Sequence, residues 1–199
     1  MQIDVSIEER INKCKSRRSN DIYLFSNVFS EDICNKLIDH AKKNAKYRLE
    51  LGPHQNVRAY ETSITKNDTF FFKHIVSKLR DINNYLHYKY NIAMHSGYKG
   101  GGNDIISLRK IYGPTNFHQD GVKPNPHSHS VRNLSVIIAL NGDYDGGEIV
   151  FPGQNFKTKL KQGEAIAFPP YWTHPHYTED LKNNTFRYTI NTWITEDLR

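Results

Sequence analysis

Helical periodicity dominates the first half of the chain. After Ser30, which suits a helix N-cap, apolar residues recur at helical spacing: Ile33, Leu37, Ile38 and Ala41. A second, longer stripe follows a start at Asn67 or Asp68 and consists of Phe71, Ile75, Leu79, Ile82 and Leu86. The pattern predicts two amphipathic helices whose apolar faces pack against a sheet.

Short strands are predicted from Ile105 onward, where β-branched and aromatic segments alternate with turn residues. These segments are 105–112, 133–140, 148–151, 157–161, 164–168 and 185–194, and two earlier strands are expected at 21–29 and 58–64. The segment 141–147, rich in Asn, Asp and Gly, is typical of a hairpin connection. Short strands after helices predict an α+β fold, mainly β, with helices packed on an antiparallel double sheet.

The last predicted strand has two chemically different faces. One face carries Phe186, Tyr188, Ile190 and Ile194; the other carries Arg187, Thr189, Asn191 and Trp193. If the aliphatic face packs on the helices, the other face points inward and takes Arg187 with it. A buried guanidinium is costly unless it is paired, so its partner is either an anionic ligand or a protein carboxylate.

Length and composition fit one domain of 199 residues, with 37% hydrophobic and 24% charged residues. We expect a short helix or frayed arm at 1–19, helical support at 20–104 with a glycine-rich turn at 97–102, and the β core at 105–195. No apolar run reaches membrane-spanning length, so no membrane partner is expected. Two cysteines do not indicate a disulfide scaffold, which favours a reducing cytoplasm.

Net charge is +6, which is compatible with an acidic partner such as nucleic acid. The lysines are, however, spread along the chain without a dense block. This distribution favours an ordinary solvated basic surface.

Candidate metal ligands form a His-x-Asp pair, His118 and Asp120, in a segment that reads as extended. Side chains two residues apart on a strand share a face, so both can reach one ion. A third ligand is offered by His174 or His176, between which alternation alone cannot choose. Two histidines and one carboxylate form the facial triad of non-haem Fe(II) oxygenases. His127 and His129 lie in a proline-rich segment that could cover a substrate.

The order of these motifs resembles that of the Fe(II)/2-oxoglutarate-dependent dioxygenases. Within this family it is most similar to the prolyl 4-hydroxylase-like branch, and the resemblance covers about residues 20–195. The order runs from Tyr-Gly at 112–113 through His-x-Asp, Gly-Gly-Glu at 146–148 and Phe-Pro at 168–169 to a distal His and an Arg six residues before a Trp. The resemblance implies a double-stranded β-helix, or jelly-roll, with supporting N-terminal helices. By the spacing seen in relatives, it favours His176 as the distal ligand, eight residues after Phe168 and eleven before Arg187.

The resemblance also implies roles around the metal. Arg187 would hold the far carboxylate of 2-oxoglutarate, with hydrogen bonds from Tyr112 and Thr189. Fe(II), 2-oxoglutarate, O₂ and ascorbate are the expected cofactors and cosubstrates. The expected reaction hydroxylates a substrate C–H bond, with a prolyl residue of a peptide or protein as substrate, and releases succinate and CO₂.

Two other functions remain as alternatives. One is oxidative demethylation of nucleic acid, but such demethylases usually carry a second Arg six residues after the first, where this chain has Trp193. The other is a non-catalytic jelly-roll that binds metal or a small acid, which an intact triad together with Arg187 argues against.

Overall fold

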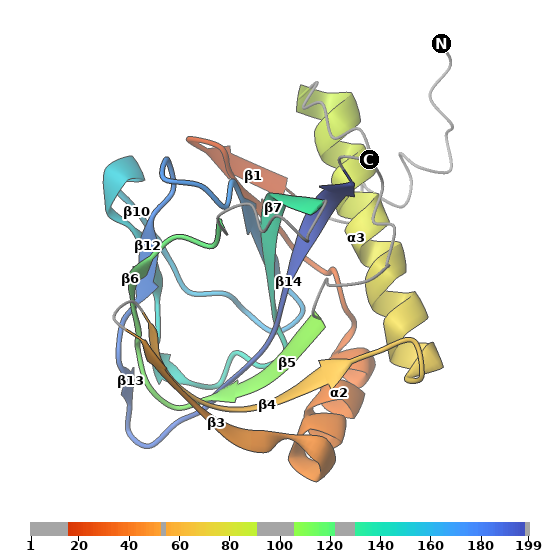
Figure 1. The fold of residues 1–199 in the computed structure, drawn as a ribbon, viewed down its shortest axis with the longest axis vertical. Helices are drawn as coiled ribbons and strands as arrows, with labels where there is room; N and C mark the ends of the chain where they lie inside the picture. Colours follow the sequence, from red (N-terminus) through yellow and green to blue (C-terminus); the bar gives the residue numbers. More distant parts are fainter. Residues whose placement is uncertain (1–15, 53–54, 91–105, 122–129, 198–199) are drawn as a thin grey trace.

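The computed structural model describes residues 16–52, 55–90, 106–121 and 130–197, and two β-sheets and two long helices account for most of them (Figure 1). The predicted arm up to residue 15, the glycine-rich turn at 97–102 and the proline-rich segment with its two histidines lie outside the described residues.

The larger sheet has eight antiparallel strands in the order β1-β2-β11-β7-β14-β5-β4-β3. Their bounds are β1 (Ser16–Ser19), β2 (Ile22–Phe25), β3 (Lys46–Gly52), β4 (Gln55–Ile64), β5 (Ile106–Ile111), β7 (Ser130–Ala139), β11 (Ala165–Phe168) and β14 (Arg187–Asp197). Most neighbours in the sheet are distant in sequence, so the chain crosses repeatedly between sheets.

The smaller sheet has the order β10-β9-β12-β6 and faces part of the larger one (Figure 1). Its strands are β6 (Thr115–His118), β9 (Ile149–Phe151), β10 (Phe156–Thr158) and β12 (His176–Thr178), with the 3-10 turn η1 (Pro152–Gln154) between β9 and β10. A two-stranded ladder joins β8 (Asp145–Gly146) to β13 (Leu181–Lys182).

Both predicted helices are present. Helix α2 (Glu31–Asn44) begins after Ser30, whose side chain accepts a hydrogen bond from the backbone N–H of Ile33. Helix α3 (Thr69–Tyr90) buries four members of its predicted stripe, Ile75, Leu79, Ile82 and Leu86, while Phe71 is partly buried. Both helices lie on the same side of the large sheet (Figure 1).

Alternation along the central strands gives the large sheet two apolar faces. On β14, Tyr188, Ile190 and Ile194 pack into the core that the sheet forms with the helices, as predicted, whereas Phe186 of the same predicted face is exposed. On β11, Ile166 and Phe168 point the other way and join Phe151 of the small sheet in a second core. The arrangement confirms the mainly β, helix-supported fold class.

Two local predictions were wrong. Ser16–Ser19 forms strand β1 rather than part of a helix, because it pairs with β2. The segment 141–147 is not a hairpin: β7 and β9 belong to different sheets, so the segment is a crossover between them. The region expected as helical support also contributes β2, β3 and β4 to the large sheet.

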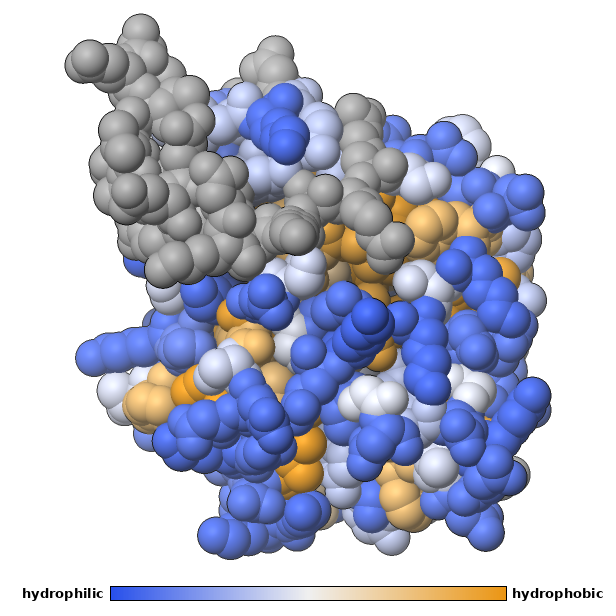
Figure 2. Space-filling view, turned by 180° about the vertical axis from the view of Figure 1, so that it is seen from behind, coloured by the Kyte–Doolittle hydropathy of each residue, from blue (hydrophilic) through white to orange (hydrophobic). Residues whose placement is uncertain are grey.

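The surface is largely hydrophilic on the face seen from behind, with apolar side chains in smaller areas between charged ones (Figure 2). Among the described residues, no helix is long and apolar enough to cross a membrane. Cys34 is a free thiol, and burial raises its pKa to about 11.

Candidate active site

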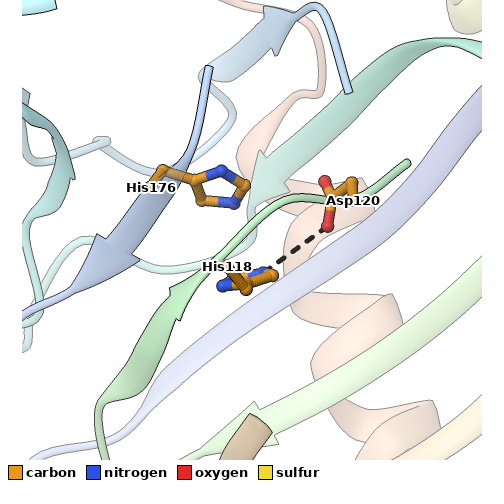
Figure 3. A group of neighbouring side chains, drawn as sticks. All are labelled: His118, Asp120 and His176. Carbon is orange, nitrogen blue, oxygen red and sulfur yellow. Dashed lines mark ion pairs between the residues drawn. The ribbon is translucent and has the colours of Figure 1, made fainter. Parts of the chain in front are cut away.

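Strands β6 and β12 bring two histidines together. His118 ends β6, His176 begins β12, and the two residues are direct partners in the antiparallel ladder. Asp120 lies two residues after His118, and its carboxylate lies close to the imidazole rings of the two histidines (Figure 3). The ligand atoms of His118, Asp120 and His176 all lie within 4.8 Å of one another, a separation that allows one ion to contact all three.

Hydrogen bonds hold the carboxylate of Asp120 in an ionised state. Its Oδ2 accepts a 2.6 Å hydrogen bond from Ser135 Oγ, and its Oδ1 lies 3.5 Å from His118 Nε2. Burial alone would raise the pKa of Asp120, but hydrogen bonds from His118 and Ser135 and the neighbouring charge of His176 hold it well below its usual range. Arg132 fixes the backbone at the same residue by donating from Nη1 to the carbonyl of Asp120 at 2.6 Å.

The two imidazoles are oriented through their Nδ1 atoms. His118 Nδ1 lies 2.7 Å from the carbonyl of Asn116, and His176 Nδ1 lies 3.2 Å from the carbonyl of His174. Because a carbonyl oxygen accepts each of these hydrogen bonds, Nδ1 carries the proton and Nε2 is the ring atom whose lone pair could bind a metal. Burial lowers the pKa of His176 to about 4, so that its ring is neutral at neutral pH.

His118 differs from His176 in its electrostatics. Burial would lower its pKa, but the hydrogen bond and negative charge of Asp120 raise it above the usual value. Without a cation in the centre, His118 and Asp120 therefore stabilise each other as a partial ion pair. The donor set of two imidazoles and one ionised carboxylate fits Fe(II).

His174 lies outside this cluster although it is only two residues from His176. Its Nε2 lies 2.9 Å from the carbonyl of Asn20, and its Nδ1 lies 2.9 Å from Thr173 Oγ1. Both ring nitrogens are thus engaged with the N-terminal segment and with its own loop. The structure thereby separates two histidines that alternation treats alike.

A cavity of about 330 Å³ extends from the cluster across the inner face of the large sheet. Its walls include Arg187, Thr189, Asn191 and Trp193, the face of the last strand that was predicted to point inward. Arg187 is 5% exposed and donates from Nη1 to the carbonyl of Gly147 at 2.6 Å. The cavity therefore connects a potential metal centre with a buried positive charge.

Arg187 does not use all of its hydrogen-bond donors. Its Nε is buried without a partner, and within the described ranges no carboxylate forms an ion pair with it. Burial lowers its pKa, and the nearby Arg109 lowers it further. Of the two partners predicted for this residue, a protein carboxylate is absent from its contacts with the described residues.

Two glycines form the turn whose backbone contacts Arg187. Gly146 and Gly147 have φ angles of 70° and 69°, and a Cβ on Gly146 would lie 2.2 Å from the carbonyl oxygen of Asp180. The chain can therefore turn here from the large sheet toward the small one only without a side chain. The turn presents the carbonyl of Gly147 to Arg187.

Tyr112 is the predicted site residue that the structure does not bring to the cavity. Ser107, Arg109 and Ile111 line the cavity, so the next residue in an extended chain faces the opposite side. The ring of Tyr112 lies 6.0 Å from that of Tyr60 instead. Thr189 does line the cavity, where its hydroxyl donates to Asn191 Oδ1 at 2.7 Å.

Sequence reasoning missed four residues of the site. Tyr144 lines the cavity from within the crossover segment, and its hydroxyl donates to the carbonyl of Leu160 at 3.0 Å. Ser135 and Arg132 hold Asp120, and Arg109 contributes a third guanidinium to the wall beside those of Arg132 and Arg187. Strand alternation around 105–112 and 133–140 could have placed Arg109 and Ser135 inside, but the two segments gave no signal of which face was inner.

Comparisons with known proteins agree with this geometry. Residues 109–195 match the family described as the 2OG-Fe(II) oxygenase superfamily. No curated protein sequence matches the chain significantly.

Similar solved structures include a viral collagen prolyl hydroxylase from Paramecium Bursaria Chlorella virus-1, in a 2OG complex. It has 19% identity and a TM-score of 0.66 over 88% of this chain and 96% of that one. A Pseudomonas putida prolyl-4-hydroxylase has 11% identity and a TM-score of 0.60 over 94% and 96%. A Trichoplax adhaerens prolyl hydroxylase in complex with a hypoxia inducible factor peptide fragment has 14% identity and a TM-score of 0.62 over 94% and 86%.

At these identities the structures establish a common fold, while the family match covers the segment that contains His118, Asp120, His176 and Arg187. The chain therefore shares the fold of these prolyl hydroxylases, and its segment 109–195 resembles the 2OG-Fe(II) oxygenase superfamily.

Proposed function

We propose that His118, Asp120 and His176 hold Fe(II) and that Arg187 binds the far carboxylate of 2-oxoglutarate. The proposal rests on one observation: the three candidate metal ligands and Arg187 line the same cavity. Three ligand atoms within 4.8 Å of one another lie at one end, and a buried guanidinium with an unpartnered Nε lies in the same wall. Tyr112 is left out of this site because it lies off the cavity.

The iron would supply the oxidation, coupled to conversion of 2-oxoglutarate and O₂ into succinate and CO₂. The chain's own residues would bind and orient the metal and the cosubstrate. Ser135 and Arg132 fix Asp120, the backbone carbonyls of Asn116 and His174 fix the two rings, and Arg187 sets the position of the cosubstrate.

For the substrate, we propose a prolyl residue in a peptide or protein. The support is the fold shared with three proteins that are described as prolyl hydroxylases, one of them in complex with a peptide. Ascorbate is proposed as the reductant that keeps the iron in its Fe(II) state.

The test is a succinate-release screen with Fe(II), 2-oxoglutarate and ascorbate. Candidate substrates are proline-rich peptides, free amino acids and methylated oligonucleotides, each analysed by mass spectrometry for the gain of one oxygen. We expect succinate release to rise with a proline-rich peptide, and the added oxygen to map to proline. Release that rises only with a methylated oligonucleotide would instead support the demethylase.

The two neighbouring histidines provide an internal test of the ligand set. We expect His176→Ala to lose metal binding and turnover, because its Nε2 is one of the three clustered donors. His174→Ala should keep most of its metal affinity, since its ring bonds to Asn20 and Thr173. Metal affinity is measured by calorimetry alongside the thermal unfolding midpoint of each variant. The reverse order, with His174→Ala inactive and His176→Ala active, would exclude His176 from the ligand set.

A further inference from the structure

The cavity wall contains one more guanidinium, that of Arg109, which the proposed function does not use. Arg109 comes from β5, where alternation places it on the inner face with Ser107 and Ile111. Its positive charge is close enough to act on both His118 and Arg187, and it tends to lower the pKa of each. Arg109 is the ladder partner of Thr189 on β14, two residues from Arg187, and lines the same cavity as His118 and Arg187.

A network across two strands clamps Arg109 by one edge only. Glu61 on β4 is its direct partner in the ladder, and Arg109 Nε donates to Glu61 Oε2 at 2.7 Å. The other carboxylate oxygen accepts from Ser107 Oγ at 3.1 Å. Glu61 is well shielded, with a side chain 8% exposed. The clamp fixes the position of the guanidinium without using the whole of its donor fork.

The remaining donors of Arg109 are unassigned. Among residues that the structure describes, its terminal amino groups make no hydrogen bond, although the side chain is only 16% exposed. A guanidinium carries five N–H groups in a planar fork and can bind a second carboxylate through the edge that Glu61 leaves free. In a cavity that already places Arg187 at one end, such a group favours a ligand with two carboxylates.

We propose that Arg109 binds the carboxylate next to the oxo group of the 2-oxo acid, while Arg187 binds the far one. The inference rests on the proposed function, since it assigns the second carboxylate of the same cosubstrate. A strand cross-link between β4 and β5 would account for Glu61 and Ser107 but would leave the free edge of Arg109 in the cavity without a role.

Two ligands distinguish the contributions of the near and the far carboxylate to binding. 2-Oxoglutarate carries both, whereas 2-oxopentanoate has the same five-carbon chain with a methyl group in place of the far carboxylate. Each is titrated by calorimetry into Mn(II)-loaded protein without O₂, so that binding is measured without turnover. Loss of a contact to the near carboxylate weakens both ligands, whereas loss of a contact to the far carboxylate weakens 2-oxoglutarate alone.

The informative variant is the double replacement of Arg109→Met with Glu61→Gln. Replacing Arg109 alone would remove the guanidinium that pairs with the shielded carboxylate of Glu61, which destabilises the fold for reasons unrelated to binding. The matched control is Lys110→Met, which removes one positive charge from the next residue of the same strand. Lys110 lies on the opposite face, with its Nζ 3.9 Å from the centre of the Phe186 ring. Thermal unfolding confirms that each variant is folded.

We expect the double variant to weaken both ligands by a similar factor, about ten- to a hundred-fold. Arg187→Ala should weaken 2-oxoglutarate to nearly the level of 2-oxopentanoate, and Lys110→Met should change neither. Unchanged affinities in the folded double variant would overturn the assignment, and so would a loss confined to 2-oxoglutarate. If wild-type protein binds neither ligand, the proposed function itself fails.

Discussion

Asp120→Ala is expected to abolish iron-dependent turnover and to lower Fe(II) affinity by more than about a hundred-fold. Replacing groups that only support a ligand typically costs 10–100-fold, and this change removes the anionic ligand itself. It also removes the acceptor for Ser135 Oγ and the charge that raises the pKa of His118. The expected protein therefore has two neutral imidazoles and no carboxylate at the centre.

Metal affinity and succinate release are measured together for Asp120→Ala, Asp120→Asn and wild type. The matched control is Asp39→Ala, which removes a carboxylate from α2 whose side chain is 64% exposed and pairs only with Lys42 among the described residues. The control should behave as wild type. Full turnover by folded Asp120→Ala would remove Asp120 from the ligand set.

Arg187→Ala is expected to weaken 2-oxoglutarate binding by about a hundred-fold or more while Fe(II) still binds. Hydrogen bonds to charged groups contribute about 1.5–3 kcal/mol each, and the guanidinium can offer two to one carboxylate. Arg187→Lys should be milder, because the charge remains although the planar fork is lost. The hydrogen bond to Gly147 disappears with the side chain in Arg187→Ala, so some loss of stability accompanies the loss of binding.

The apparent 2-oxoglutarate constant and the Fe(II) affinity are measured for wild type, Arg187→Ala and Arg187→Lys, with the unfolding midpoint of each. Arg187→Met serves as a control for length, since it fills similar space without charge. A cosubstrate constant that stays at the wild-type value in folded Arg187→Ala would make Arg187 a structural residue, and the anion site would then lie elsewhere.

Local sequence patterns determined the structural elements that depend on interactions between residues close together in the chain. The cap at Ser30 and the stripe from Ile75 to Leu86 predicted the helices, because helix formation depends on neighbours three and four residues apart. Alternation on the last strand predicted that Arg187 and Tyr188 face opposite sides. Which side chains of a strand point inward can be predicted without long-range information once one face is clearly apolar.

Pairing between distant strands was beyond these patterns. Ser16–Ser19 is a strand because β2 lies beside it, and the segment 141–147 crosses between sheets because β7 and β9 have other partners. Turn chemistry reports a change of direction, and the Asn, Asp and Gly residues there suit a crossover as well as a hairpin. Which strands become neighbours depends on the whole topology.

The candidate site divides in the same way. The sequence by itself determined the residue types and their order: a His-x-Asp pair, a distal histidine and an inward-facing Arg187. Only the tertiary structure placed His176 opposite His118, turned both nitrogens of His174 toward other partners, and moved Tyr112 off the cavity. Side chains converge on one point when strands far apart in sequence pair in a fixed register, and register is a property of the folded sheet.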